Sequence, residues 1–369
     1  MGKTLLLQKM AHLCNINALP PEFARENFRA QYFSFQGKKN FGEVIDLLIN
    51  GLKDFKAWYQ IDFAKTYQLI RSIFSAPEIE VGGVKFSVNF PEYKRSWKAI
   101  FNATLEEIAA VQEKAGGKLI LIFDELPIML WEWYKEGRQD EAMEFLDMMR
   151  ERRQALETKG LRFIYCGSVG AKVVLSTFIK KFKYTGEPTN DMEEFDLEPF
   201  SAEEANFLCE CFLLSGFKID PKEKEDCFRL IYELSNGIPF YISLLFNSIQ
   251  KDFDREITPT TIRNAYKLIL TGPKYQKVFA HLIERLETYY SVEQKDEMIK
   301  ALNFLSGCDA PIREDIIYEE IKSTNKGLLN EILYKLLGDH YLHREFDKGK
   351  RLYSFKYQLF KEWWQINQA

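Results

Sequence analysis

The chain has 369 residues, 46% of them hydrophobic and 28% charged, which is enough for two or three domains with a sizeable core. Its net charge of −4 gives no electrostatic reason for the whole chain to bind nucleic acid non-specifically. No run approaches the ~18 apolar residues of a membrane helix, and no signal peptide is recognisable, so we expect a cytoplasmic protein without a membrane partner.

The chain opens with Met-Gly-Lys-Thr and an apolar run that predicts a helix over 4–13. Gly2, Lys3 and Thr4 match the last three positions of a phosphate-binding loop, G-x-x-x-x-G-K-[ST]. In such a loop the glycine lets the backbone approach the phosphates, the lysine reaches the β- and γ-phosphates, and the threonine hydroxyl binds Mg²⁺. Three residues also match by chance in many proteins, so the motif needs support from the rest of the chain.

The next segment predicts alternating strands and helices. The expected elements are a strand at 29–36, helices at 41–55 and 60–75, a hairpin at 78–90 and a helix at 95–114. The region 56–115 reads as an insertion into the first domain. We interpret it as a packed structural element, with docking of a partner as the alternative.

A buried strand is predicted at KLILIFDELP, residues 118–127. Its apolar run, 119–123, is typical of a strand covered on both faces, as in a parallel sheet. Asp124 and Glu125 follow at the carboxyl end, where open α/β sheets bind ligands. An acid at this place holds Mg²⁺ in P-loop ATPases, and its neighbour can act as general base toward water. The plain alternative is a strand end capped by solvated acids.

Further along, the pattern changes from α/β to helical. We expect a charged helix at 138–158, a buried strand at 160–170 that ends in Gly167-Ser168, and a short strand at 193–201. Ser201 and Glu204 form a capping box, and the signals stay helical to about residue 287. The rest, 288–369, reads as three helices and a hairpin that turns at Lys348-Gly349, the order of a winged helix.

Six cysteines are scattered along the chain without a C-x-x-C pair. Cys209 and Cys211 lie two apart in a predicted helix, so their side chains leave on different sides. We therefore expect free thiols in a reducing compartment rather than a cysteine metal site.

Taken together, MGKTLLLQ, LILIFDELP, RFIYCGSVG, DLEPFSAEEA and SNGIPFYI resemble the archaeal-type ATPases of the STAND group, relatives of AAA+ P-loop NTPases. The resemblance implies a P-loop NTPase α/β domain with a parallel sheet over 1–200, a helical lid over 201–287 and a winged-helix-like domain over 288–369. It also implies that Ser168 lies near the γ-phosphate, and that Gly237 and Pro239 lie beside the nucleotide base. From spacing alone, Gly237-Ile-Pro239 is a helix break followed by a helix start.

The sequence departs from the family pattern at its beginning. Family members carry a strand and the first glycine of the loop before Gly-Lys-Thr, and we expect the natural protein to begin upstream of Met1. We expect the missing strand to be central in the sheet, next to the strand that ends at Asp124.

Two basic groups have alternative interpretations. Arg150, Arg152 and Arg153 on the 138–158 helix either supply an arginine finger or form a solvated face, and we favour the solvated face. The predicted wing carries basic residues that can contact DNA phosphates: His343, Arg344, Lys348, Lys350 and Arg351. Because the predicted recognition helix, 325–337, is dominated by leucines, we favour protein contact over DNA.

These patterns predict an ATP-binding protein, a Mg²⁺-dependent ATPase if the loop is completed upstream, that acts as a nucleotide-driven switch. Lys3 would contact the phosphates, Thr4 and Asp124 the Mg²⁺, Glu125 would orient water and Ser168 would sense the γ-phosphate. A protein client or self-association through the lid and tail would be the output. The alternative is a non-catalytic DNA-binding or adaptor protein with a degenerate ATPase fold. A role in defence or toxin–antitoxin systems, as in some relatives, is a third reading that the residues do not test.

Overall fold

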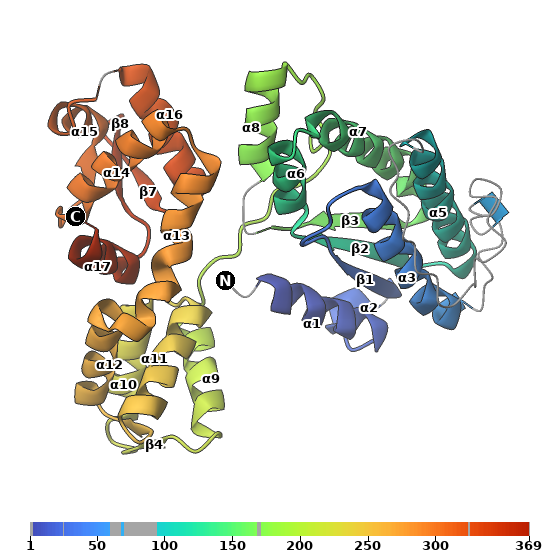
Figure 1. The fold of residues 1–369 in the computed structure, drawn as a ribbon. Coiled ribbons are helices and arrows are strands. Elements are labelled where there is room, and N and C mark those ends of the chain that lie inside the picture. Colours follow the sequence, from blue (N-terminus) through green and yellow to red (C-terminus); the bar gives the residue numbers. More distant parts are fainter. Residues whose placement is uncertain are drawn as a thin grey trace. The chain divides into compact units, whose positions relative to one another are not determined.

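The structure is a computed structural model, and it describes residues 3–24, 26–59, 68–69, 94–167, 171–323 and 325–368 (Figure 1). The chain forms two compact units. One ends at Glu194 and the other begins at Phe195. Each is described by itself below.

The first unit is built on a parallel sheet, which confirms the predicted α/β class. Its strands β1 (Phe28–Ser34), β2 (Lys118–Asp124) and β3 (Leu161–Tyr165) lie in the order β1-β2-β3. Ser34 pairs with Asp124, and Phe123 pairs with Tyr165, so the carboxyl ends of all three strands meet at one edge.

Helices cover both faces of this sheet (Figure 1). The helical elements of this unit are α1 (Lys3–Asn15), α2 (Pro21–Ala24), α3 (Phe41–Tyr59), α5 (Lys94–Ala115), α6 (Leu126–Lys135), α7 (Gln139–Leu156), the 3₁₀ turn η1 (Glu157–Lys159) and α8 (Ala171–Phe182). On one face, Leu7, Ala11 and Cys14 of α1 pack against Ala30 of β1 and Ile122 of β2. Their spacing of four and three residues places them on one side of the helix, as an amphipathic helix requires.

Aromatic side chains fill the opposite face of the sheet. Phe123 of β2 touches Phe33 and Phe35 from the β1 side, and Phe35 also contacts Phe145 of α7. Trp133 of α6 contacts the same Phe145 ring. This cluster joins the sheet to the helices that follow β2.

The predicted insertion is partly a core element. Trp97, Ile100, Phe101 and Leu105 of α5 are buried, and the Phe101 ring packs against Phe145. This supports the interpretation of a packed structural element for the part that is described. The expected hairpin at 78–90 lies outside the described residues, and so does the expected helix at 60–75 apart from residues 68–69.

Three expectations for this region were wrong or incomplete. Residues 193–201 form no strand, because most of their side chains are exposed, no neighbouring strand pairs with them, and Pro199 cannot donate a backbone hydrogen bond. Helices α6 and α8 were missed. The place expected for an additional strand, beside β2, is already taken, because β2 pairs with β1 on one side and β3 on the other.

The second unit begins with a helical group. Its elements are α9 (Ala202–Leu213), β4 (Lys218–Ile219), α10 (Lys224–Ser235), α11 (Pro239–Asp252), β5 (Glu256–Ile257) and α12 (Pro259–Thr271). The predicted capping box is confirmed: the Ser201 hydroxyl accepts from the Glu204 amide, and the Glu204 carboxylate accepts from the Ser201 amide. The Phe212 and Phe246 rings stack in its core.

The rest of this unit has the order of elements expected of a winged helix. Its elements are η2 (Pro273–Tyr275), α13 (Gln276–Tyr289), α14 (Val292–Ser306), β6 (Ile312–Arg313), α15 (Glu314–Glu320), α16 (Lys326–Gly338), β7 (Leu342–Asp347), β8 (Lys350–Phe355) and α17 (Gln358–Asn367). Strands β7 and β8 form the predicted hairpin, whose turn residues Lys348 and Gly349 both have positive φ. The division of this unit into lid and winged-helix domains stays a prediction. In the described part of the chain, no helix is long and apolar enough to cross a membrane.

Candidate functional site

The candidate site lies where the carboxyl ends of the three strands meet the beginning of α1. Side chains alternate between the two faces of a strand, so the register of the sheet decides which residues share a face with Ile122. On β1 this is Tyr32, on β2 it is Asp124, and just after β3 it is Cys166. Tyr32 and Cys166 pack against the core beneath α1, which places these three side chains at the start of that helix.

Asp124 is the centre of the site and is almost fully buried, at 1% exposure. Its Oδ2 accepts hydrogen bonds from the Thr4 hydroxyl at 2.7 Å and the Tyr32 hydroxyl at 2.8 Å. Its Oδ1 accepts from the backbone amide of Glu125 at 3.0 Å. A buried carboxylate requires such partners, because leaving either oxygen without a donor would cost its full desolvation penalty.

Lys3 belongs to the same edge of the sheet. Its ammonium Nζ donates to the carbonyl oxygen of Gly167 at 3.2 Å, just beyond β3. The structure therefore brings together Lys3, Thr4 and Asp124, three of the residues singled out from the sequence. Gly2 and Ser168 lie outside the described residues.

Glu125 occupies a strained position between β2 and α6. Its φ of 58° and ψ of 24° are left-handed, a conformation that non-glycine residues seldom adopt. Its carbonyl accepts from the Met129 amide, and the next amide, of Leu126, donates to the Cys166 carbonyl. These backbone hydrogen bonds join the end of β2 to the segment after β3. They place Glu125 directly after Asp124, at the point where the chain passes from β2 into α6.

The electrostatic environment keeps two neighbouring groups protonated. Burial, the hydrogen bond to Asp124 and the charge of that carboxylate together raise the pKa of Tyr32 to about 12. Burial, with the Asp124 charge adding to it and the Lys3 charge opposing it, raises the pKa of Cys166 to about 11. At neutral pH both groups are therefore uncharged, and Tyr32 is a hydrogen-bond donor.

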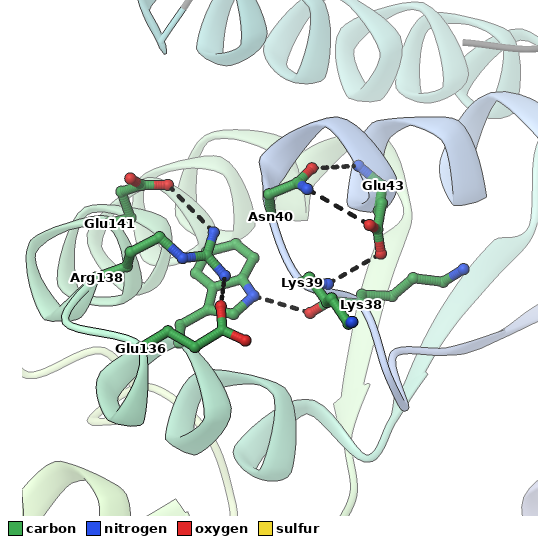
Figure 2. Close-up of polar contacts among 8 residues, drawn as sticks. Lys38, Lys39, Asn40, Glu43, Glu136, Arg138 and Glu141 are labelled. Carbon is green, nitrogen blue, oxygen red and sulfur yellow. Dashed lines mark hydrogen bonds and ion pairs between the residues drawn. The ribbon is translucent and has the colours of Figure 1, made fainter. Parts of the chain in front are cut away.

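The loop after β1 is tied to helix α6 (Figure 2). The Trp133 indole donates to the Lys38 carbonyl at 2.8 Å, and the Arg138 guanidinium lies over the Trp133 ring. Asn40 and Glu43 exchange hydrogen bonds at the beginning of α3. These contacts hold the chain that leaves β1 close to the helix that leaves β2, which fixes the strand carrying Tyr32.

The oxygen ligands at the site suit a hard cation. A carboxylate and a hydroxyl, from Asp124 and Thr4, are ligand types that Mg²⁺ prefers. Among the described residues, no group of three or more His, Cys, Asp or Glu side chains is arranged to hold a metal. A Mg²⁺ ion at this edge would thus complete its coordination with phosphate and water, as Mg²⁺ commonly does.

Gly237 and Pro239 belong to the second unit, and both have structural roles there. Gly237 has a φ of +68°, and a Cβ built on it would lie 2.2 Å from the Phe200 carbonyl oxygen. The Phe200 amide donates to the Gly237 carbonyl at 2.8 Å. Pro239 occupies the first turn of α11. Their expected place beside a nucleotide base stays a prediction.

The arginines of α7 do not form a uniformly solvated face. Arg153 is 8% exposed, forms an ion pair with Asp191, and donates to the Pro188 carbonyl and the Tyr165 hydroxyl. It thus fastens the segment before residue 194 to the sheet. Arg152 pairs with Glu106 and Glu151. For Arg153 the favoured interpretation was wrong, since the spacing on α7 did not indicate a partner 38 residues away.

Sequence reasoning missed Tyr32 as a member of the site and named Cys166 only as one of the free thiols. Both lie on the same face as Asp124 by the two-residue alternation of the strands. The alternation would have suggested them only together with the register of the sheet, in which Ser34 pairs with Asp124.

Comparisons with known proteins give only distant structural likenesses. No family model matches the chain, and no curated protein matches it. The ORC2 protein of Aeropyrum pernix, solved as ADPNP–ADP complexes, is similar over 100% of this chain and 84% of its own, with 12% identity and a TM-score of 0.48. The Thermotoga maritima RuvB Holliday junction branch migration motor is similar over 69% of this chain and 80% of its own, with 11% identity and a TM-score of 0.30. Likenesses at this level do not establish a family.

Proposed function

We propose that this chain binds Mg-ATP at the edge of the parallel sheet in its first unit and acts as a nucleotide-driven switch. One observation carries the proposal: the Thr4 hydroxyl at the start of α1 donates to Asp124 at the end of a buried strand. These two residues lie 120 positions apart, and in P-loop NTPases a threonine and an acid of this kind hold the Mg²⁺ together.

Each residue has a distinct role in this proposal. Lys3 neutralises the β- and γ-phosphates, and the beginning of α1 adds the favourable end of the helix dipole. Thr4 and Asp124 hold the Mg²⁺, which when bound offsets charge on the phosphates. Glu125 orients the attacking water, and Ser168 senses the γ-phosphate. Gly2 lets the backbone approach the phosphates, and Gly237 and Pro239 flank the base.

In this proposal, nucleotide binding changes the contacts that the second unit makes. Such a switch needs a nucleotide that binds two states of the protein with different affinities. The proposed binding partner of the second unit is a protein client or a second copy of the chain.

The test is a binding titration of fluorescent mant-ATP with the purified chain, followed by a hydrolysis assay. We expect Lys3→Ala to abolish measurable binding, because a phosphate-contacting charge is lost. Lys9→Ala, which removes an exposed lysine on the same helix, is the matched control and should bind like the parent. We expect Glu125→Gln to keep binding and to slow hydrolysis by about 100-fold or more. Equal binding by parent and Lys3→Ala, or loss of binding in Glu125→Gln, would contradict the assigned roles.

A second candidate function, DNA binding by the tail, is favoured by one face of the β7–β8 hairpin. Phe346 is 66% exposed there, the Arg344 guanidinium lies over its ring, and Arg351 is its cross-strand partner. An exposed aromatic ring between two arginines suits stacking on a base with contacts to phosphate. The leucine-rich α16 argues against it, because Leu329, Ile332, Leu333 and Leu336 are buried in the domain itself.

A further inference from the structure

The strongest unassigned feature is the phenol of Tyr32, which enters the candidate site from β1. Tyr32 is partly buried, and its ring packs in the cluster beneath α1. Its hydroxyl donates to Asp124 Oδ2 at 2.8 Å, the same oxygen that accepts from Thr4. Nothing in the phosphate-loop motif or in the acidic strand end requires a tyrosine at this place.

Three of the donors to Asp124 are an amide and two hydroxyls. The Glu125 amide donates to Oδ1, while the Thr4 and Tyr32 hydroxyls both donate to Oδ2. When Mg²⁺ is bound, the Thr4 oxygen offers a lone pair to the cation while its proton points to Asp124, so the position of Thr4 depends on the cation as well as on the carboxylate. Tyr32 is a hydroxyl donor from the sheet whose position does not depend on the cation.

The place of Tyr32 in the sheet supports this role. Tyr32 is held in place because β1 pairs with β2 along its whole length and the loop after it is tied to α6. A donor on a paired strand keeps its partner carboxylate fixed better than a donor on a loop.

We propose that Tyr32 is a positioning residue for the cation: through its hydrogen bond it holds Asp124 in the orientation that binds Mg²⁺. This inference rests on the proposed function and concerns the same site. Loss of an outer hydrogen-bond partner of a metal ligand typically lowers metal affinity about 10- to 100-fold.

The test compares Tyr32→Phe with the parent in a Mg²⁺ titration at a fixed concentration of mant-ATP. The variant keeps the ring and removes only the hydroxyl. We expect the Mg²⁺ concentration at half-maximal effect to rise about tenfold, while the mant-ATP affinity in EDTA stays unchanged. A general structural role would instead lower the mant-ATP affinity in EDTA by the same factor.

Tyr184→Phe is the matched control. The Tyr184 hydroxyl donates to the Asp147 carboxylate at 2.5 Å in the same unit, so the same kind of hydrogen bond is removed outside the site. We expect its Mg²⁺ titration to coincide with that of the parent. If Tyr32→Phe also coincides with the parent, or binds Mg²⁺ more tightly, the inference is wrong although the proposed function stands. If the parent binds no mant-ATP with or without Mg²⁺, the proposed function fails first.

Discussion

At the scale of single residues, the molecule uses buried polar side chains to join distant segments. Asp124 joins α1, β1 and β2 through three donors, and Arg153 joins α7, β3 and the segment around Asp191. Both networks satisfy charged groups that would otherwise be costly to bury. One of them lies in the candidate site and the other is structural.

The Arg153 network predicts a specific dependence of stability on pH. Hydrogen bonding from Arg153 holds the pKa of Asp191 below its usual range, so this pair stabilises the fold above the unfolded pKa of Asp191. That stability is lost as the pH falls through the lower, folded pKa. We expect Arg153→Met to destabilise the first unit by about 2–3 kcal/mol at pH 7 and to flatten the acid limb of its stability curve.

The measurement is the free energy of unfolding from urea denaturation at several pH values between 3 and 7, monitored by circular dichroism. Lys135→Met, which removes an exposed cation at the end of α6, is the matched control and should change stability by less than about 0.5 kcal/mol. An unchanged pH dependence in Arg153→Met would show that the pair with Asp191 does not contribute.

At the scale of elements, the turn between α10 and α11 combines two constraints on one glycine. Gly237 has a positive φ, and a Cβ added there would lie 2.2 Å from the Phe200 carbonyl oxygen, too close for any side chain. We expect Gly237→Ala to destabilise the second unit by about 2–3 kcal/mol, as measured by thermal or urea denaturation.

A substitution at Gly349 is the matched control, because it tests a positive φ without a close steric contact. Gly349 also has a positive φ, of +78°, but a Cβ there would meet nothing within 4 Å. Gly349→Ala should therefore cost only the backbone strain, about 1 kcal/mol. Equal losses in the two variants would mean that the contact with Phe200 adds nothing.

The sequence predicted some of the helices and strands and missed others, for physical reasons. The buried run before Asp124 and the helix after Gly-Lys-Thr were predictable from composition and periodicity alone. Helix α6 was missed because its Leu126-Pro127 start follows a left-handed Glu125 without a side-chain cap, so the usual helix-start signal is weak. The strand expected at 193–201 was wrong because an apolar–acidic alternation cannot reveal that no partner strand is present.

The candidate site shows the same division. Lys3, Thr4 and Asp124 were found from motifs, and the structure brings them together. Tyr32 was not recognised, because its place depends on the register of β1 with β2. Outside the site, the structural role of Arg153 was not predicted, because it depends on a contact with Asp191. Such long-range pairings are tertiary facts, which local patterns do not contain.

At the scale of the whole molecule, the small negative net charge bears on the second candidate function. A chain with a net charge of −4 has no general attraction to DNA, so any binding must come from a local basic surface. If the β7–β8 hairpin is that surface, Arg344→Ser together with Arg351→Ser should weaken a gel shift and lower the salt dependence of binding by about two phosphate contacts.

The control for this experiment replaces two exposed arginines elsewhere in the same unit, Arg229 and Arg263, by serine. It makes the same change in net charge and should leave the gel shift unchanged. Parallel losses in both double variants would mean that the hairpin is not the binding surface, and absence of any shift by the parent would remove this candidate function.

The strand order of the first unit has one more consequence. Within the described residues β3 pairs only with β2. The side of β3 that faces away from β2 is therefore an edge of the sheet to which a further strand can pair. A parallel strand added there would finish next to Cys166 and Gly167, the residues that adjoin Lys3. If the chain binds a nucleotide there as proposed, such a strand would end beside the place assigned to the phosphates, so extension of the sheet and ligand affinity would be thermodynamically linked.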